Sequence, residues 1–304
     1  MKRQRVIGIF DSGVGGLTVM KGILEKLPDV RIVYFGDTAR VPYGNRSREE
    51  LIRFGEEIVT FLVGQGAEVI VVACNTSSAT ALPFLREYFD LPMIGMVEPG
   101  ARLAVEKTIA GRIGLIATET TVRSKAYKFG VKRALKKGIL PEDLELRKAW
   151  QQGEQEIALV KAQGCPLFVP LVEAGLANST QAHAIAQTYL EPLKEAGVDT
   201  LILGCTHYPF LEPVIRAILG EDVLIIDPAL AVVQELEKLL PYLDKLEHSG
   251  LIGSLSPPSF SDKNHKRSHY YVSGDPGLFR QVGNTLLREP IDNVKQINLE
   301  AKDL

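Results

Sequence analysis

The chain has 304 residues, 45% of them hydrophobic and 24% charged, with a formal net charge of -2 at pH 7. This length favours two compact domains, and the balanced charge gives no reason to expect a nucleic acid or a membrane as a partner. Three cysteines in so long a chain argue against a disulfide framework. Because the first apolar run ends at Asp11 and no run is long enough to span a bilayer, the sequence predicts a cytoplasmic protein.

The first third of the chain alternates short apolar segments with amphipathic ones. Strands are expected at 6–10, 31–35, 69–73 and 93–97, with helices at 16–27, 48–63 and 76–88. Ser47 and Glu50 have the spacing of a capping box at the start of the second helix. This order of strand and helix predicts an α/β fold with a parallel, doubly wound sheet.

A second series of the same kind follows. Its strands are expected at 113–117, 144–148, 167–172 and 201–203, and its helices at 121–136, 153–163 and 179–195. Later helices are expected at 210–219, 229–240 and 277–287, and later strands at 223–226 and 269–272. Pro99 and Gly100 interrupt the pattern, which indicates a domain boundary near residue 98. The segment 247–268 is rich in Ser, Gly and Pro and predicts a mobile surface insertion.

Cys74 stands at the end of the most apolar predicted strand, 69–73. Asn75 and Thr76 follow it and suit a strand-to-helix turn. In open α/β sheets, ligands bind at the carboxyl ends of the strands. A helix amino terminus there lowers the pKa of a thiol and offers N–H groups to an anion. Cys74 is therefore a candidate for thiolate chemistry.

Cys205 repeats this arrangement in the second half of the chain, where Thr206 and His207 follow another apolar strand. We hypothesise that the two halves face each other across a cleft and present one thiol each to opposite sides of a small anionic substrate. A Cys-x-His pair is also compatible with half of a zinc site, but no CxxC spacing accompanies it. The nearby thiol favours a catalytic over a structural role for His207.

Other candidates lie in loops on the same predicted edge. Asp11 and Ser12 either serve a ligand or cap the next helix, and the glycines after them match neither the dinucleotide fingerprint nor a P-loop. Further polar positions of this kind, each equally compatible with a turn, a cap or an exposed side chain, are Tyr43, Gly44, Thr118, Thr121 and Glu173. Cys165 has no polar partner in the sequence and is expected to enter a buried strand as an inert core thiol.

Taken together, these motifs resemble those of glutamate racemases, in the cofactor-independent aspartate/glutamate racemase family. The resemblance runs over nearly the whole chain and is carried by GIFDSGVGGLTV, YFGDTARVPYG, VVACNTSSA, GLIATETTV, PLFVPLVEAG, LGCTHYPFL and YYVSGDP. It implies two similar α/β domains with the active site in the cleft between them. The first domain would comprise residues 1–98 plus 209–304, and the second residues 99–208.

The resemblance also implies a two-base mechanism that uses neither pyridoxal phosphate nor a metal. Cys74 would take the α-proton from D-glutamate and Cys205 from L-glutamate, while Asp11, His207 and Glu173 would help the thiols to exchange protons. Substrate contacts would come from Asp11, Ser12, Tyr43, Gly44, Asn75, Thr76, Thr118, Thr121, Thr206 and His207. The family further implies a homodimer that supplies D-glutamate for the bacterial cell wall and so for cell shape.

Two alternatives remain open from the sequence. One is racemisation of aspartate or another small amino acid, because two thiols define the reaction type more firmly than the length of the side chain. The other is a two-lobed protein that binds an amino acid without altering it, although binding alone does not require a second thiol. The segments 149–164 and 247–268 look longer than their usual equivalents in the family.

Overall fold

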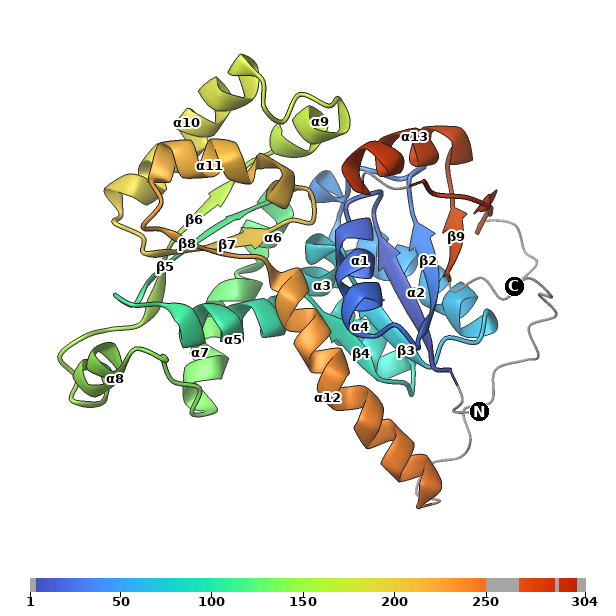
Figure 1. Cartoon of the computed structure of the whole chain (residues 1–304), viewed down its shortest axis with the longest axis horizontal. Coiled ribbons are helices and arrows are strands. Elements are labelled where there is room, and N and C mark those ends of the chain that lie inside the picture. Colours follow the sequence, from blue (N-terminus) through green and yellow to red (C-terminus); the bar gives the residue numbers. More distant parts are fainter. Residues whose placement is uncertain (1–3, 250–267, 288–289, 300–304) are drawn as a thin grey trace. The chain divides into compact units, whose positions relative to one another are not determined.

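The computed structural model describes residues 4–249, 268–287 and 290–299, and the chain forms two compact units (Figure 1). The first unit contains Met1–Gly95 and Val232–Leu304, and the second contains Met96–Ala231. Residues 250–267, which make up most of the predicted insertion, lie outside the described part of the chain. Among the described residues, no helix combines the length and the apolar character needed to cross a membrane.

The first unit is built on a six-stranded sheet with the order β10-β9-β2-β1-β3-β4, in which neighbouring strands pair in parallel. Its strands are β1 (Val6–Asp11), β2 (Arg31–Gly36), β3 (Val69–Val72), β4 (Met93–Gly95), β9 (Ser268–Val272) and β10 (Val294–Gln296). Its helices are α1 (Leu17–Lys26), η1 (Tyr43–Asn45), α2 (Arg48–Gly64), α3 (Asn75–Thr80), α4 (Leu82–Tyr88) and α13 (Pro276–Leu287). The long helix α12 (Pro228–His248) carries the chain from the second unit back into the first.

Local sequence explains the central elements of this unit. All four residues of β3 are buried, as expected for a strand covered on both faces, and burial of each such side chain stabilises the fold by about 1.5–3 kcal/mol. The predicted capping box at α2 is confirmed, because Glu50 N donates to Ser47 Oγ at 3.1 Å and Ser47 N donates to Glu50 Oε2 at 2.9 Å. The buried apolar face of α2 packs in the same core cluster as β3.

The second unit is built on a four-stranded parallel sheet with the order β6-β5-β7-β8. Its strands are β5 (Arg112–Ala117), β6 (Ala158–Gly164), β7 (Thr200–Gly204) and β8 (Leu224–Ile226). Its helices are α5 (Val97–Lys107), α6 (Glu119–Ser124), α7 (Ala126–Lys136), α8 (Leu144–Gln151), α9 (Phe168–Glu173), α10 (Thr180–Glu195), η2 (Tyr208–Leu211) and α11 (Glu212–Leu219). The predicted fold class of two parallel α/β sheets is therefore confirmed.

Three predicted elements of the second unit are wrong in type. The expected strand at 144–148 is helix α8, which Asp143 caps by accepting a hydrogen bond from Leu146 N at 2.7 Å. The expected helix at 153–163 is largely strand β6, an edge strand whose mostly half-buried residues lack a long apolar run. The expected strand at 167–172 is helix α9, in which Pro170 lacks the N–H that a sheet ladder needs.

The domain limits also differ from the prediction. The chain returns to the first unit at Val232 and not at residue 209, because β8 pairs with β7 and α11 packs against α10 in the second unit. The first crossing, between Gly95 and Met96, lies close to the predicted boundary. Pro99 does not interrupt the pattern there, since it lies in the first turn of α5, where its missing N–H costs no hydrogen bond.

Candidate active site

In the first unit, several polar side chains follow the carboxyl ends of neighbouring strands. The register pairs Asp11 with Gly36 and Gly36 with Val272, and it pairs Phe10 with Val72. Because the strands are parallel, the residues just after them share one edge of the sheet. Polar residues within two positions of these strand ends include Asp11, Ser12, Asp37, Cys74 and Ser273.

Cys74 lies at this edge, where the chain changes from β3 to α3. It is the N-cap residue of α3, has an extended backbone conformation, and is only 5% exposed. The neighbouring strand end is close, since Ala73 N donates to Phe10 O at 2.9 Å, one residue before Asp11. The predicted setting of this thiol, a strand end followed directly by a helix, is therefore confirmed within its unit.

Asp11 is fully buried and orders the loop that follows β1. Its Oδ2 accepts a hydrogen bond from Gly13 N at 3.0 Å, and Tyr34 OH donates to Gly13 O at 2.8 Å. A Cβ at Gly16 would lie 2.6 Å from Asp11 Cβ, so a glycine is needed there. The N-cap of α1 is Gly16 with no side-chain hydrogen bond, so Asp11 does not play the alternative role of helix cap.

Tyr43 is also buried, and its hydroxyl has a partner inside the protein. The phenol donates a hydrogen bond to Asp37 Oδ2, and burial raises the pKa of Tyr43 well above its ordinary value, with a further increase from the negative charge of Asp37. The ring packs 5.7 Å from that of Phe54. The phenol stays protonated and donates its one hydrogen bond to Asp37, so it has no hydrogen bond left to donate to a ligand.

In the second unit, the residues after β5, β6 and β7 share the carboxyl edge of the smaller sheet. Ala117 pairs with Gly164 and with Gly204, so Thr118, Cys165 and Cys205 follow in a row. Cys205 is 8% exposed. This thiol therefore holds the same place on its sheet as Cys74 holds in the first unit.

Cys205 has an imidazole and a carboxylate beside it. Its Sγ lies 3.9 Å from His207 Nδ1, and His207 Nε2 lies 3.2 Å from Glu173 Oε1. When Nε2 donates to the carboxylate, Nδ1 is left as an acceptor that faces the thiol. The three side chains form a chain that can pass a proton away from sulfur. Glu173 ends α9 rather than the strand that was predicted.

The threonines of the second unit are only partly explained by helix capping. Thr118 is the N-cap of α6 and accepts from Thr121 N at 3.3 Å, while the two hydroxyl oxygens lie 2.9 Å apart. Thr206 is buried next to Cys205. The predicted capping role of Thr118 is thus confirmed, and the hydroxyls of Thr118 and Thr121 lie at the carboxyl edge beside β5, where a ligand role remains a prediction.

Cys165 is fully buried, and its burial raises the pKa of the thiol far above the ordinary value. It follows β6 and precedes α9, so it leaves a strand rather than entering one. This thiol is not suited to act as a base, in agreement with the sequence prediction.

No group of three or more His, Cys, Asp or Glu side chains in the described ranges is placed to hold a metal ion. The candidate thiols are Cys74 at the larger sheet and Cys205 at the smaller one, and Cys205 has His207 and Glu173 beside it.

Comparison with known proteins defines the family. The family model described as Asp/Glu/Hydantoin racemase matches residues 7–236. The chain belongs to this racemase family. A curated relative, the glutamate racemase of Geobacter metallireducens, is 44% identical over 298 residues, which is 98% of both chains. The glutamate racemase of Bacillus cereus is 37% identical over 303 residues and is covered completely. The resemblance seen in the sequence is confirmed, and this membership makes the chain an isomerase.

Solved structures of the family share the fold. The glutamate racemase of Thermus thermophilus, in complex with beta-chloro-D-alanine, superposes with a TM-score of 0.73 at 39% identity, covering 98% of each chain. The glutamate racemase of Francisella tularensis, in complex with D-glutamate, has a TM-score of 0.78 at 32% identity, covering 98% of this chain and 99% of that one.

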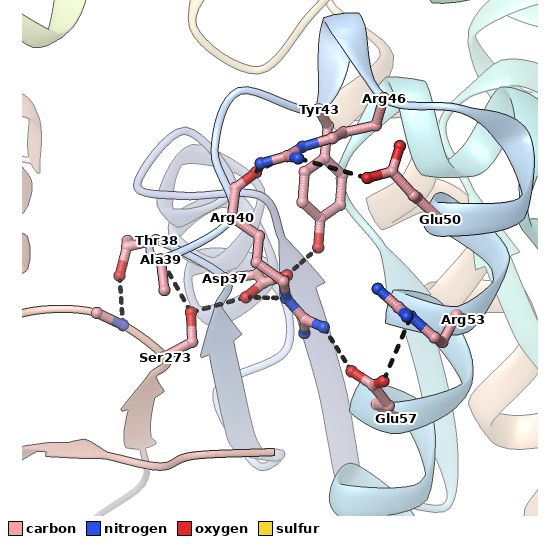
Figure 2. Close-up of polar contacts among 11 residues, drawn as sticks. Asp37, Thr38, Ala39, Arg40, Tyr43, Arg46, Glu50, Arg53, Glu57 and Ser273 are labelled. Atoms are coloured by element: carbon pink, nitrogen blue, oxygen red, sulfur yellow. Dashed lines mark hydrogen bonds and ion pairs between the residues drawn. The ribbon is translucent and has the colours of Figure 1, made fainter. Parts of the chain in front are cut away.

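Sequence reasoning missed the residues that hold Tyr43. Asp37 accepts a hydrogen bond from the Tyr43 hydroxyl, and Arg40 and Ser273 donate to the same carboxylate (Figure 2). A signal was present, because Asp37 lies two residues after the predicted strand 31–35, at the same predicted sheet edge as Cys74. The contribution of Ser273 could not be seen from local sequence, since it lies 236 residues away along the chain.

Proposed function

We propose that this racemase interconverts L-glutamate and D-glutamate by a two-base mechanism in which Cys74 and Cys205 act on opposite faces of one α-carbon. The observation that supports it most is the matched placement of two buried thiols, each within two residues of the end of a strand, at the carboxyl edge of its own sheet. Simple binding of an amino acid would need neither thiol. The names of the full-length relatives support glutamate as the substrate.

In this mechanism, one thiolate removes the α-proton and the other thiol delivers a proton to the opposite face. Ionising an ordinary thiol of pKa about 8.5 at pH 7 costs roughly 2 kcal/mol, so forming the thiolate base adds little to the activation free energy. The more difficult step is to stabilise the carbanion beside the carboxylate. Each preorganised hydrogen-bond donor at that position contributes about 3–4 kcal/mol. We propose that Cys74 starts from D-glutamate and Cys205 from L-glutamate.

The neighbours of the thiols restore their protonation after each turnover. One turnover moves a proton from one sulfur to the other, so the next turnover in the same direction needs the reverse exchange. His207 is placed to take the proton of Cys205, and Glu173 to stabilise the imidazolium that forms. We assign the corresponding role in the first unit to Asp11, which is buried at the adjacent strand end.

Substrate binding is assigned to the polar residues of the two carboxyl edges. The amino acid has one ammonium group and two carboxylates, so it needs both an anionic partner and several donors. We propose Asp11 for the ammonium group and, for the remaining contacts, Ser12, Tyr43, Gly44, Asn75, Thr76, Thr118, Thr121, Thr206 and His207. Most of these residues are buried, which favours strong electrostatic interaction with a bound ligand.

We further propose that the enzyme acts in the cytoplasm as a homodimer and supplies D-glutamate for peptidoglycan and cell shape.

The decisive experiment follows both inversion and α-proton exchange. Purified enzyme with L-glutamate in deuterated buffer and no added cofactor should give racemic glutamate labelled at the α-carbon. Cys74→Ser and Cys205→Ser should each lower the rate of inversion by about 10²–10⁴-fold. Cys165→Ala is the matched control, since this third thiol is buried away from solvent, and its rate should stay near that of the unmodified enzyme.

Unimpaired inversion in either serine variant would refute the assignment of two bases. Parallel assays with L-aspartate distinguish the glutamate assignment from racemisation of the shorter diacid. Faster turnover of aspartate would replace the proposed substrate while leaving the proposed chemistry intact.

A further inference from the structure

Asp37 lies at the centre of a buried polar network in the first unit (Figure 2). It is 0% exposed and directly follows β2. Its Oδ1 accepts from Ser273 Oγ at 2.7 Å and from Arg40 Nε at 3.0 Å. Its Oδ2 accepts from Arg40 Nε at 2.7 Å and from Tyr43 OH. A buried carboxylate with donors on both oxygens is fixed in orientation and resists movement.

The donors come from different parts of the chain. Tyr43 belongs to η1, Arg40 to the loop before it, and Ser273 to the end of β9, far along the sequence. The loop and the β9 end are joined again by backbone groups, since Ala39 N donates to Ser273 Oγ at 2.9 Å and Gly274 N donates to Thr38 Oγ1 at 3.0 Å. The segment 38–45 is therefore tied to the sheet edge at several points, of which the Asp37 carboxylate is one.

Arg40 donates hydrogen bonds to both oxygens of this carboxylate. Its guanidinium also donates to Glu57 Oε2 on α2 and lies 4.0 Å above the ring of Phe54. The same ring packs against Tyr43. Arg40 thus connects the carboxylate, the aromatic pair and α2, so Tyr43 is held at its hydroxyl by Asp37 and at its ring by Phe54.

The single proton of the Tyr43 hydroxyl is donated to Asp37, which restricts what Tyr43 can do for a substrate. A carboxylate of an amino acid accepts hydrogen bonds and cannot donate one. The phenol therefore cannot donate to that carboxylate while it donates to Asp37. Any contribution of Tyr43 to binding must come from where the segment places its other groups, and this placement depends on Asp37.

From this geometry we infer that Asp37 is a positioning residue, which fixes the Tyr43–Gly44 segment for substrate binding through the Tyr43 hydroxyl. The inference rests on the proposed function, because it takes that segment as part of the substrate site. The backbone N–H of Asp37 donates to Asp11 O at 3.0 Å, so Asp37 also links this segment to the loop of Asp11. Asp37 acts on binding and not on proton transfer.

The test compares Asp37→Asn, Tyr43→Phe and the double variant by steady-state kinetics with glutamate. Asp37→Asn should raise KM by about tenfold or more, because a charge-assisted hydrogen bond is lost. Its kcat should remain within about threefold, since the segment binds ground state and transition state alike. Tyr43→Phe should act in the same direction, and the double variant should have a KM no higher than that of Asp37→Asn alone.

A KM of the double variant that is raised by the product of the two single factors would overturn the inference, because it would show that the phenol binds substrate independently of Asp37. An unchanged KM in Asp37→Asn would overturn it as well. Ser273→Ala removes one donor to the same carboxylate and serves if Asp37→Asn does not fold, with an expected rise in KM of about threefold. An unchanged KM in Ser273→Ala would then count against the inference.

Hydrogen exchange separates this inference from the proposed function. In Asp37→Asn, amides of residues 38–45 should exchange faster than in the unmodified protein, whether or not glutamate is the substrate. Asp199→Asn in the second unit is the control for general loss of stability. The Asp199 carboxylate accepts from backbone N–H groups at the amino-terminal edge of the smaller sheet. This variant should leave exchange at 38–45 and KM unchanged. Unaltered exchange in Asp37→Asn overturns the inference, whereas failure of the unmodified enzyme to turn over glutamate overturns only the proposed function.

Discussion

The two units place their thiols alike but surround them differently. Cys205 has His207 at 3.9 Å and, behind it, Glu173. Cys74 follows β3, next to the strand that ends in the buried carboxylate of Asp11. An imidazole can both accept and donate near neutral pH, whereas a carboxylate mainly accepts. Under the proposed two-base mechanism the two thiols would therefore be unequal bases, and the two directions of racemisation should respond differently to substitution.

The opposite edges of the two sheets show a second contrast. In the first unit, buried Arg5 contacts Glu68 at 2.6 Å and Asp244 at 2.8 Å. In the second unit, Asp199 accepts hydrogen bonds from Thr108 Oγ1 and from backbone N–H groups including that of Arg112, at 2.7 and 2.8 Å. One edge is thus held by an ion-pair network and the other by a single carboxylate with neutral donors.

The largest effect on stability is expected for Arg5→Met. It would remove the guanidinium that donates to Glu68, a carboxylate only 3% exposed. Breaking a buried pair in this way costs about 3–5 kcal/mol. Chemical denaturation should show this loss for the first unit, and Arg53→Met, at an exposed i,i+4 pair with Glu57, is a control that should change stability by less than about 1 kcal/mol. Equal losses in the two variants would show that the buried pair at this edge contributes no more than an ion pair on the surface.

His207→Asn should slow catalysis by about hundredfold and should do so more strongly with L-glutamate than with D-glutamate. The physical reason is that the imidazole serves Cys205, which we assign to the L enantiomer. Circular dichroism gives the initial rate in each direction, and α-exchange is measured at early times. The quantity compared is the loss of rate with L-glutamate relative to the loss with D-glutamate. Because equilibrium constrains the ratio of kcat/KM values, the asymmetry is sought in kcat and in single-turnover exchange. Equal loss of both exchange rates would contradict the unequal-base interpretation.

Asp199→Asn should lower the free energy of unfolding by about 2 kcal/mol near neutral pH, since several donors lose a charged acceptor. Burial on its own would raise the pKa of Asp199, but hydrogen bonds from Thr108 and from backbone N–H groups outweigh it and hold the pKa below its ordinary value of 3.8. The stabilisation is therefore fully present above the unfolded pKa and is lost as the pH falls through the folded one. The difference between the two proteins should shrink below about pH 4, and a difference that grows in acid would contradict this account.

Glu173→Gln should have the smallest effect, a decrease of about tenfold in kcat for L-glutamate. The amide can still accept from His207 Nε2, but it cannot stabilise an imidazolium by charge. Comparison with His207→Asn in the same assay tests whether the two residues act as one chain. A double variant that is slower than His207→Asn alone by the full factor would show that Glu173 acts separately.

Much of this arrangement follows from local sequence. The apolar strands and the polar turns after them predicted the positions of both thiols. The capping box at Ser47 predicted the start of α2. The prediction failed between Leu144 and Glu173, where β6 is a half-buried edge strand and α9 is a short apolar helix. In such short segments, burial depends on neighbours far along the chain, so period and composition do not decide between strand and helix.

The network around Asp37 was beyond sequence reasoning for a related reason. Its partner Ser273 is brought there by the pairing of β9 with β2, a contact between distant segments. Only the motif after β2 gave a local indication.

The late arrival of β9 has a consequence for synthesis of the protein on the ribosome. β2 lies between β1 and β9, so its outer edge stays open until residues near the carboxyl terminus have been translated. The second unit is a single uninterrupted stretch and can be completed while the ribosome is still working. We therefore expect the nascent chain to finish its units in the reverse of their order of first appearance, and the exposed β2 edge to be the point at which a chaperone or premature self-association acts.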